Sequence, residues 1–176
     1  MPRTTPAVLR PPSVDGIAEA TARDQLTYLI WQVRSYGYEW THGGPRFTLA
    51  MMMFGWVFAV VPLLVPIVLA RVRSPRSRYY TTGQAILGVV AQRRTLEPTW
   101  LLGDHAVATQ RHGHGKALRD ALLPTLVATS DHHGIVLIAE TRSHRLAHQY
   151  AAELPGATIT RRRNGTYQIR RAPRGR

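Results

Sequence analysis

The 176-residue chain contains no cysteine, a single lysine and few acidic residues. Without cysteine it cannot form a disulfide, a thiolate zinc site, an iron–sulfur cluster or a cysteine nucleophile. Ten acidic residues against 23 basic ones give a net charge of +13, which predicts anionic partners such as phosphates, nucleic acid or acidic lipid. Because Lys116 is the only lysine, we interpret the arginine bias mainly as the mark of a GC-rich bacterial genome.

Charge and hydropathy divide the chain into two parts. Residues 1–70 have a net charge of +1, whereas residues 71–176 have a net charge of +12. Within the first part, residues 49–70 form a run of 22 residues without a charge, hydroxyl or amide side chain. A helix of that length spans roughly 33 Å, enough for the hydrocarbon core of a bilayer. We predict one transmembrane helix within residues 47–72; a re-entrant hairpin turning at its two prolines and a long buried helix are the alternatives.

The flanks of this run predict its orientation. Four arginines follow it directly, at positions 71, 73, 76 and 78, and Tyr79 and Tyr80 resemble the aromatic residues of a membrane interface. The positive-inside rule then predicts a single-pass protein of the bacterial cell membrane, with a cytoplasmic C-terminal domain and arginines near anionic lipid headgroups. Val68–Ala70 also satisfies a small-residue cleavage rule, although the run starts late and is long for a signal peptide.

The residues before the run predict a tail, one helix and a linker. Residues 1–14 are rich in proline and lack apolar periodicity, so we expect a flexible tail. Residues 15–46 predict an amphipathic helix, capped by Ser13 or Asp15 and ending near Tyr36, followed by a linker. Its apolar face would pack on protein or lie in a membrane interface.

Residues 79–176 predict an α/β domain. Apolar runs, polar connections and turn signals alternate along this part of the chain. The predicted elements are strands at 85–91 and 99–108, a helix at 116–129, a strand at 135–140, a helix from the N-cap Ser143 to about 153, and a terminal hairpin around Asn164–Gly165. This order predicts a mixed sheet with flanking helices.

The sequence QRHGHG at residues 110–115 follows a predicted strand and opens a predicted helix. Gly113 and Gly115 allow a tight turn that presents backbone N–H groups to an anion, and the helix dipole adds to the attraction. Arg111 and Lys116 would supply charge-assisted hydrogen bonds to a pyrophosphate. Such a turn by itself is also typical of a glycine-rich connection that binds nothing.

This turn resembles the Q/R-x-x-G-x-G/A signature of the GNAT superfamily of N-acetyltransferases, and it matches every specified position. The family continues with a helix of pattern N-x-x-A-x-x-x-Y-x-x-x-G, in which Tyr150 occupies the tyrosine position. Ser143 replaces the asparagine, Leu146 replaces the alanine, and Gly156 comes two residues late. The resemblance covers residues 85–176 and implies a partial GNAT-like mixed sheet. The amphipathic helix and the transmembrane helix predicted above would precede this sheet.

The resemblance also implies roles for individual residues. Tyr150 would protonate the departing thiolate of coenzyme A, and Asp104 or His105 would take a proton from the acceptor amine. The implied coenzyme A site comprises Gln110, Arg111, His112, Gly113, His114, Gly115, Lys116 and Ser143. These roles imply an acetyl-coenzyme A-dependent N-acetyltransferase with an unidentified acceptor and no metal. Together with the predicted transmembrane helix, they predict a membrane-anchored enzyme that faces the cytoplasm.

Two features leave alternatives open. The family's first strand, early helices and second strand are not evident before residue 85, so a partner subunit or a second copy of the chain would complete the site. Alternatively, the chain is a catalytically inactive membrane protein whose GNAT-like remnant and basic surface serve in scaffolding or in binding lipid or nucleic acid. Arginine runs at 161–163 and 170–171 would suit nucleic acid, but a solvated edge hairpin explains them better.

Two further constellations are weaker. His144 and His148 lie one helical turn apart, but zinc needs three or four ligands and the chain has no HExxH motif. Asp104, His105 and Ser143 have the residue types of a hydrolase triad, but no G-x-S-x-G elbow accompanies them. We therefore expect neither a metal site nor a serine hydrolase.

Overall fold

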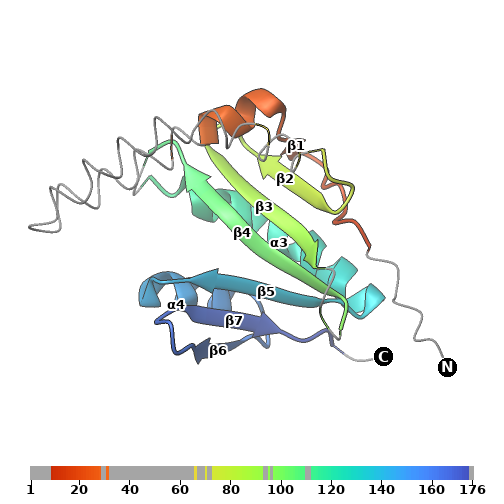
Figure 1. Cartoon of the computed structure of the whole chain (residues 1–176), viewed down its shortest axis with the longest axis vertical. Coiled ribbons are helices and arrows are strands. Elements are labelled where there is room, and N and C mark those ends of the chain that lie inside the picture. Colours follow the sequence, from red (N-terminus) through yellow and green to blue (C-terminus); the bar gives the residue numbers. More distant parts are fainter. Residues whose placement is uncertain are drawn as a thin grey trace, which may run out of the picture.

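The computed structural model describes residues 9–28, 31, 66, 70, 73–92, 95, 97–109 and 112–174. Their strands form one seven-stranded sheet in the order β1-β2-β3-β4-β5-β7-β6. Two helices, α3 (His114–His133) and α4 (His144–Glu153), pack on one face of this sheet and lie behind it in Figure 1. The mixed α/β sheet with flanking helices that we predicted is therefore confirmed.

One pair of neighbouring strands in the sheet is parallel, and the other pairs are antiparallel. Four strands, β1 (Ala18–Glu19), β2 (Ser77–Thr81), β3 (Ala85–Gln92) and β4 (Thr99–Val107), pair antiparallel in succession. Strand β5 (Val136–Thr141) runs parallel to β4, with α3 as the crossover. The terminal hairpin of β6 (Thr158–Arg161) and β7 (Tyr167–Arg171) completes the sheet, with β7 beside β5.

The elements with strong local signals fold as predicted. The two apolar runs form the hairpin of β3 and β4, and the Asn164–Gly165 turn joins β6 to β7 with Gly165 at φ +80°. Ser143 caps α4, its hydroxyl accepting a hydrogen bond from the Leu146 N–H at 3.3 Å. Each of these signals is contained within a few neighbouring residues.

The sheet extends further towards the N-terminus than predicted. Strands β1 and β2 precede residue 85 and continue the sheet beyond β3, so the sheet is not restricted to the C-terminal half. Tyr79 and Tyr80, expected at a membrane interface, are buried on opposite faces of the sheet. Because β2 has only five residues and follows an arginine-rich stretch, its pattern was mistaken for that of a membrane flank.

The N-terminal segment also differs from expectation. Residues 9–14, part of the expected flexible tail, lie against the sheet: the Tyr80 hydroxyl donates to the Pro12 carbonyl at 2.5 Å, and the Trp100 indole donates to the Leu9 carbonyl at 2.9 Å. The first helix does not begin after Ser13 or Asp15. Its helical residues 22–28 follow a reciprocal cap, in which Asp24 N–H donates to the Thr21 hydroxyl and Thr21 N–H donates to the Asp24 carboxylate.

The predicted transmembrane run at 49–70 lies outside the described residues, except for Pro66 and Ala70. No helix among the described residues is long and apolar enough to cross a membrane. Strand β1 precedes the run and β2 follows it, yet the two pair directly, Ala18 with Thr81. Both flanks of the run therefore lie on the same side of any membrane, which a single pass with an outward-facing N-terminus does not allow.

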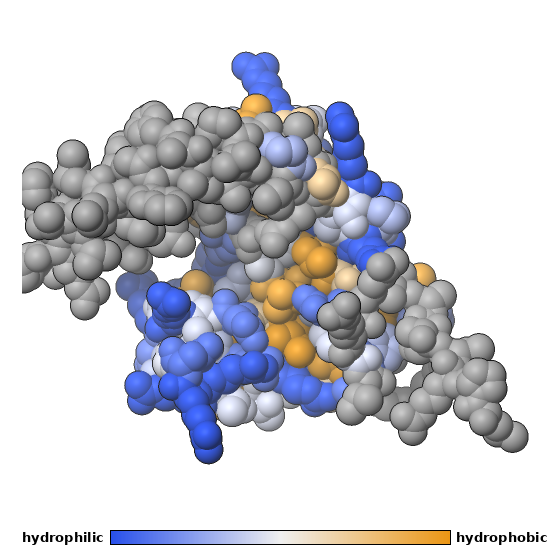
Figure 2. Space-filling model, in the orientation of Figure 1, coloured by the Kyte–Doolittle hydropathy of each residue, from blue (hydrophilic) through white to orange (hydrophobic). Residues whose placement is uncertain are grey.

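The two faces of the sheet differ. On the covered face, Leu118, Leu122 and Leu126 repeat every four residues along α3 and pack in a core that includes Leu87 and Leu102. On the opposite face, Val90, Leu101 and Ile138 form one row across β3, β4 and β5 and are only partly buried. Figure 2 shows apolar residues gathered in the middle of this second face, which looks towards the reader.

Candidate functional site

Strand β4 separates from β5 halfway along its length. The two strands pair from Thr99–Val136 to Leu102–Ala139, after which β4 continues to Val107 beside β3 alone. At the same point β4 carries a bulge, because Leu87 on β3 faces both Asp104 and His105. Bulges of this kind redirect strands and are frequent beside active sites. The result is visible in Figure 1 as the divergence of β4 and β5.

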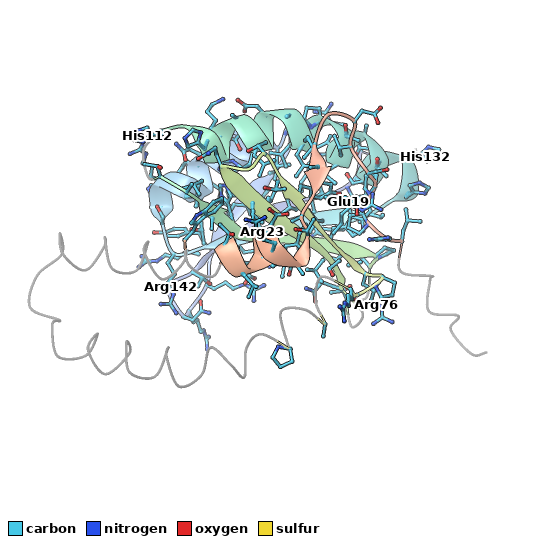
Figure 3. All side chains as sticks on the ribbon, turned by 90° about the horizontal axis from the view of Figure 1, so that it is seen from above. Glu19, Arg23, Arg76, His112, His132 and Arg142 are labelled. Carbon is cyan, nitrogen blue, oxygen red and sulfur yellow. The ribbon has the colours of Figure 1, made fainter. Side chains whose placement is uncertain are left out.

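Both helices begin at this end of the sheet. Helix α3 starts at His114, shortly after β4 ends, and α4 starts at His144, shortly after β5 ends. The first turn of each helix has backbone N–H groups without partners inside the helix. Figure 3 shows His112 and Arg142 at this end of the molecule and His132 at the opposite end. We call the end with His112 and Arg142 the site end.

The two glycines of the predicted phosphate turn have different tasks. Gly113 precedes α3 with φ +75°, a conformation that favours glycine, and a Cβ there would meet open space. At Gly115 a Cβ would lie 2.6 Å from the His105 imidazole, so the missing side chain lets α3 approach β4. A valine at position 113 would strain the backbone by itself and would not report on a phosphate. Gln110 and Arg111 lie outside the described residues.

The remaining predicted binding residues are at the protein surface or engaged in caps. His112 is exposed, and its ring lies parallel to that of His114, with centroids 6.0 Å apart. Lys116 is exposed and forms an ion pair with Asp120 one turn along α3. Ser143 lies at the end of β5, where its hydroxyl already accepts the capping hydrogen bond of α4. Lys116 can therefore turn towards a ligand, whereas Ser143 has a structural task.

A buried arginine connects the elements of the site. Arg119 lies inside α3 with 4% of its side chain exposed, and donates to the two carboxylate oxygens of Glu153 at 2.6 and 3.1 Å. Its Nη1 lies 3.4 Å from Nδ1 of His105, and its Cζ lies 5.0 Å from the centre of the Tyr150 ring. The guanidinium thus joins β4, α3 and α4 in one cluster, which we call the Arg119 cluster: Arg119, Glu153, His105 and Tyr150.

Arg119 and Glu153 were not predicted from the sequence. They are separated by 34 positions, so no local spacing connects them. One signal was present: Arg119 falls on the same helical stripe as Gly115 and Leu122, which are buried. A charged residue within a buried stripe indicates a buried partner.

Burial and the nearby charges set the protonation states of the cluster. Burial of the imidazole, and then the positive charge of Arg119, lower the pKa of His105 to about 4. Burial raises the pKa of Tyr150 to about 12, against the opposing effect of Arg119. For Arg119 itself, burial lowers the pKa, but the hydrogen bond and charge of Glu153 outweigh it and the pKa is raised. At neutral pH the cluster therefore holds a neutral imidazole, a protonated phenol and a charged guanidinium.

These states change the interpretation of the predicted base. His105 is neutral, but a pKa of about 4 makes it a weak acceptor for a proton from an amine. Its Nδ1 is also occupied by Arg119. Asp104 is its neighbour on the bulge and belongs to the predicted pair, although the structure does not describe its side chain.

The other constellations do not converge into sites. His144 and His148 have their Nε2 atoms 3.0 Å apart, but no group of three or more metal-binding side chains occurs among the described residues. On the terminal hairpin, the Tyr167 ring contacts His144 and Arg161 and is partly buried. The ring therefore offers little free surface on which a nucleic-acid base would stack.

The structure resembles solved acetyltransferases. It aligns with an acetyltransferase of the GNAT family from Listeria monocytogenes with a TM-score of 0.54 and 10% identity, covering 92% of this chain and 98% of that chain. It aligns with an acetyltransferase from Thermus thermophilus with a TM-score of 0.52 and 19% identity, covering 93% of this chain and 99% of that chain. By sequence, the chain matches no protein-family model and no curated protein. The chain therefore has a GNAT-like fold over most of its length, and not over its C-terminal half alone.

Proposed function

We propose that this protein is an acetyl-coenzyme A-dependent N-acetyltransferase. The observation that carries the proposal is the divergence of β4 from β5 beyond Leu102, with the glycine turn of α3 at its open end. The similarity of the fold to solved acetyltransferases supports it. Tyr150, buried beside this divergence, supplies the group that the chemistry needs.

The binding step uses backbone groups. Residues 103–107 of β4 have no strand partner on the β5 side among the described residues. The N–H and C=O groups that point to that side, and not towards β3, are therefore available to an extended ligand that contains amides. The pantetheine arm of coenzyme A is such a ligand. Its pyrophosphate would accept hydrogen bonds from the first turn of α3, with Lys116 and Arg111 adding positive charge.

The transfer step needs one proton donor and one proton acceptor. The acceptor amine attacks the thioester carbonyl, the C–S bond breaks, and the thiolate takes a proton. Burial raises the pKa of Tyr150 to about 12, so the phenol is protonated at neutral pH, and its hydroxyl would give that proton to the thiolate as it forms. The Arg119 guanidinium beside the ring opposes the effect of burial and favours the phenolate that is left. The amine loses its proton to Asp104 or to water, since His105 is a poor base here.

We also propose that the apolar run at residues 49–70 attaches the protein to the membrane. The support is the uncharged run of 22 residues with Pro62 and Pro66 inside it, together with the pairing of β1 with β2 across the run. The four following arginines favour a cytoplasmic position for the sheet. Tags at the two termini should be digested from the same side of sealed vesicles, and the protein should resist carbonate extraction. Tags on opposite sides would contradict the pairing of β1 with β2 across the run, and extraction by carbonate would contradict the attachment.

Acetyl transfer can be tested on the full-length chain in detergent. Because the chain has no cysteine, a thiol reagent detects only the coenzyme A released from acetyl-coenzyme A. We expect release that depends on an added amine. Tyr150→Phe keeps the ring and should bind acetyl-coenzyme A as the parent does, while transfer slows about 100-fold or more.

Two results would contradict this function. If the parent binds no acetyl-coenzyme A at millimolar concentration, the catalytically inactive alternative is the better description. If Tyr150→Phe transfers acetyl groups as fast as the parent, Tyr150 is not the acid.

A further inference from the structure

The Arg119 cluster determines which nitrogen of His105 carries the proton. A guanidinium can only donate hydrogen bonds, so Nδ1 of His105, 3.4 Å from Arg119 Nη1, must accept. A neutral imidazole that accepts at Nδ1 carries its proton on Nε2. The position of Arg119 therefore selects one tautomer of His105.

Arg119 cannot easily leave this position. Two hydrogen bonds to Glu153 hold its guanidinium, and 4% of its side chain is exposed. The Tyr150 ring lies on the guanidinium from the side of α4. Among the described side chains, the charged and titratable groups facing His105 are thus Arg119 from α3 and, behind it, Glu153 and Tyr150 from α4. Gly115, at the start of α3, lies against the ring.

The other ring nitrogen has no partner among the described groups. Nε2 of His105 is buried and forms no hydrogen bond with any described group. It lies against the first turn of α3, since a Cβ at Gly115 would be 2.6 Å from it. A buried donor without an acceptor has lost its hydrogen bonds to water and gained none in return, so such an atom calls for a partner in the functional state. The diverged end of β4, where His105 lies, is where the proposed function places a ligand.

We propose that Arg119, held by Glu153, is a positioning residue that fixes the proton of His105 on Nε2, and that this N–H donates a hydrogen bond to an oxygen of acetyl-coenzyme A. This inference rests on the proposed function and gives His105 a role opposite to that of the predicted base. The low pKa of His105 agrees with it, because a neutral donor must not gain a second proton. Contact of Nε2 with the ligand requires that the first turn of α3 adjusts when the ligand binds.

The first part of the proposal is tested without any ligand. Imidazole nitrogen NMR spectra of the full-length chain, with the His105 signals assigned by their loss in His105→Gln, report its tautomer and titration. We expect the Nε2–H form with no titration between about pH 5.5 and 8. Removing both partners in Arg119→Leu/Glu153→Leu leaves no unpaired charge, so the fold should persist. The imidazole is then free to carry its proton on Nδ1, and the pKa of His105 should rise without the Arg119 charge, although burial still lowers it. A parent His105 with its proton on Nδ1, or titrating near 6.5, would overturn the proposal.

A second buried pair supplies the matched control. Arg171 and Asp131 form a similar ion pair near the other end of α3. The Arg171→Leu/Asp131→Leu variant should leave the His105 spectrum unchanged. If it shifts His105 as much as the Arg119→Leu/Glu153→Leu variant does, the effect is a general loosening of the fold and not the position of Arg119.

The second part is tested with acetyl-coenzyme A. Calorimetry first measures whether it binds, which tests the proposed function on its own. At saturation the Nε2 signal of His105 should move. His105→Leu should lose about tenfold in affinity, whereas His105→Gln, which keeps an N–H donor, should stay within about threefold. Binding that leaves Nε2 and the affinity of His105→Leu unchanged overturns the inference but not the function; no binding at all overturns both.

Discussion

Two buried arginine–carboxylate pairs stand near opposite ends of α3, and they are built differently. Arg119 pairs with Glu153 near the start of the helix, and Arg171 on β7 pairs with Asp131 near its end. Twelve residues, or about 18 Å of helix, separate Arg119 from Asp131. In both pairs the guanidinium donates to both carboxylate oxygens, the geometry that gives the strongest ionic hydrogen bonds.

The pair at the far end is complete. Arg171 also donates to the Pro155 carbonyl at 3.1 Å and to the Ser130 hydroxyl at 3.3 Å, and Asp131 accepts from the Arg174 N–H at 2.7 Å. These bonds join α3, β7 and the segment after α4. The hydrogen bonds from Arg171 also lower the pKa of Asp131. No buried side-chain nitrogen or oxygen of this pair or of Ser130 lacks a partner among the described groups, as a structural pair requires.

The pair at the site end is incomplete. Beyond Glu153, Arg119 faces an imidazole and a phenol ring, and His105 is left with a buried nitrogen that has no partner among the described groups. It also lies beside the glycine turn, where α3 approaches β4 most closely. The comparison shows that two ion pairs of the same geometry differ in their surroundings: one set of neighbours is satisfied, and the other leaves a donor unused at the end where we propose that the ligand binds.

Replacing the carboxylate of each ion pair by leucine should have the largest effect on stability. Glu153→Leu leaves the buried Arg119 charge without its carboxylate, beside the His105 imidazole and the Tyr150 ring, and should lower the free energy of unfolding by about 3–5 kcal/mol. Asp131→Leu should cost less, because Arg171 keeps the Pro155 carbonyl and the Ser130 hydroxyl. Urea unfolding of both variants measures the order; a larger loss for Asp131→Leu would contradict the comparison.

The two ends should also lose stability in different pH ranges. The pKa of His105 is about 4 in the folded chain and about 6.5 when unfolded, so between these values only the unfolded chain takes up the proton. Stability should therefore fall by about 3 kcal/mol as the pH decreases from 6.5 to 4. The lowered pKa of Asp131 has its effect only below about pH 4. His105→Gln should flatten the unfolding free energy between pH 6.5 and 4; an unchanged slope would show that His105 is not responsible.

Alanine substitutions at two glycines test the close approach of α3 to β4, and we expect a smaller effect on stability from them. Gly115→Ala places a Cβ 2.6 Å from the His105 ring, and the resulting shift should cost about 1–3 kcal/mol. Gly103→Ala, on β4, meets nothing within 4 Å and should change stability by no more than about 0.5 kcal/mol. Scanning calorimetry compares the two; equal melting temperatures would mean that the approach is not tight.

What the sequence predicted and what it missed have a common explanation. The β3–β4 hairpin, the Ser143 cap and the Asn164–Gly165 turn depend on neighbouring residues and were predicted. Strand β1 has two residues and exists only because β2, 58 positions further along, pairs with it. No periodicity can appear in two residues. The apolar run between these strands is a strong local signal, and it led to a topology that the β1–β2 pairing excludes.

In the site, too, local signals were predicted and long-range contacts were missed. The turn at 110–115 and Tyr150 carry local or spaced motifs, so the sequence identified them as candidates. The partnership of Arg119 with Glu153, and the role of Gly115 in admitting His105, depend on distances between α3, α4 and β4 that no spacing reveals. His105 was selected as a base from its ordinary pKa, whereas burial and the Arg119 charge change that value in the fold.

Hydrogen–deuterium exchange with and without acetyl-coenzyme A tests the central claim, that the site end binds this ligand, most directly. In the full-length chain we expect the ligand to slow exchange at residues 103–107 and 112–117, where β4 leaves β5 and α3 begins. Residues 130–134 and 167–171, around the Arg171–Asp131 pair, should exchange at unchanged rates. Protection around that far pair, or no protection at the site end with saturating ligand, would contradict the account.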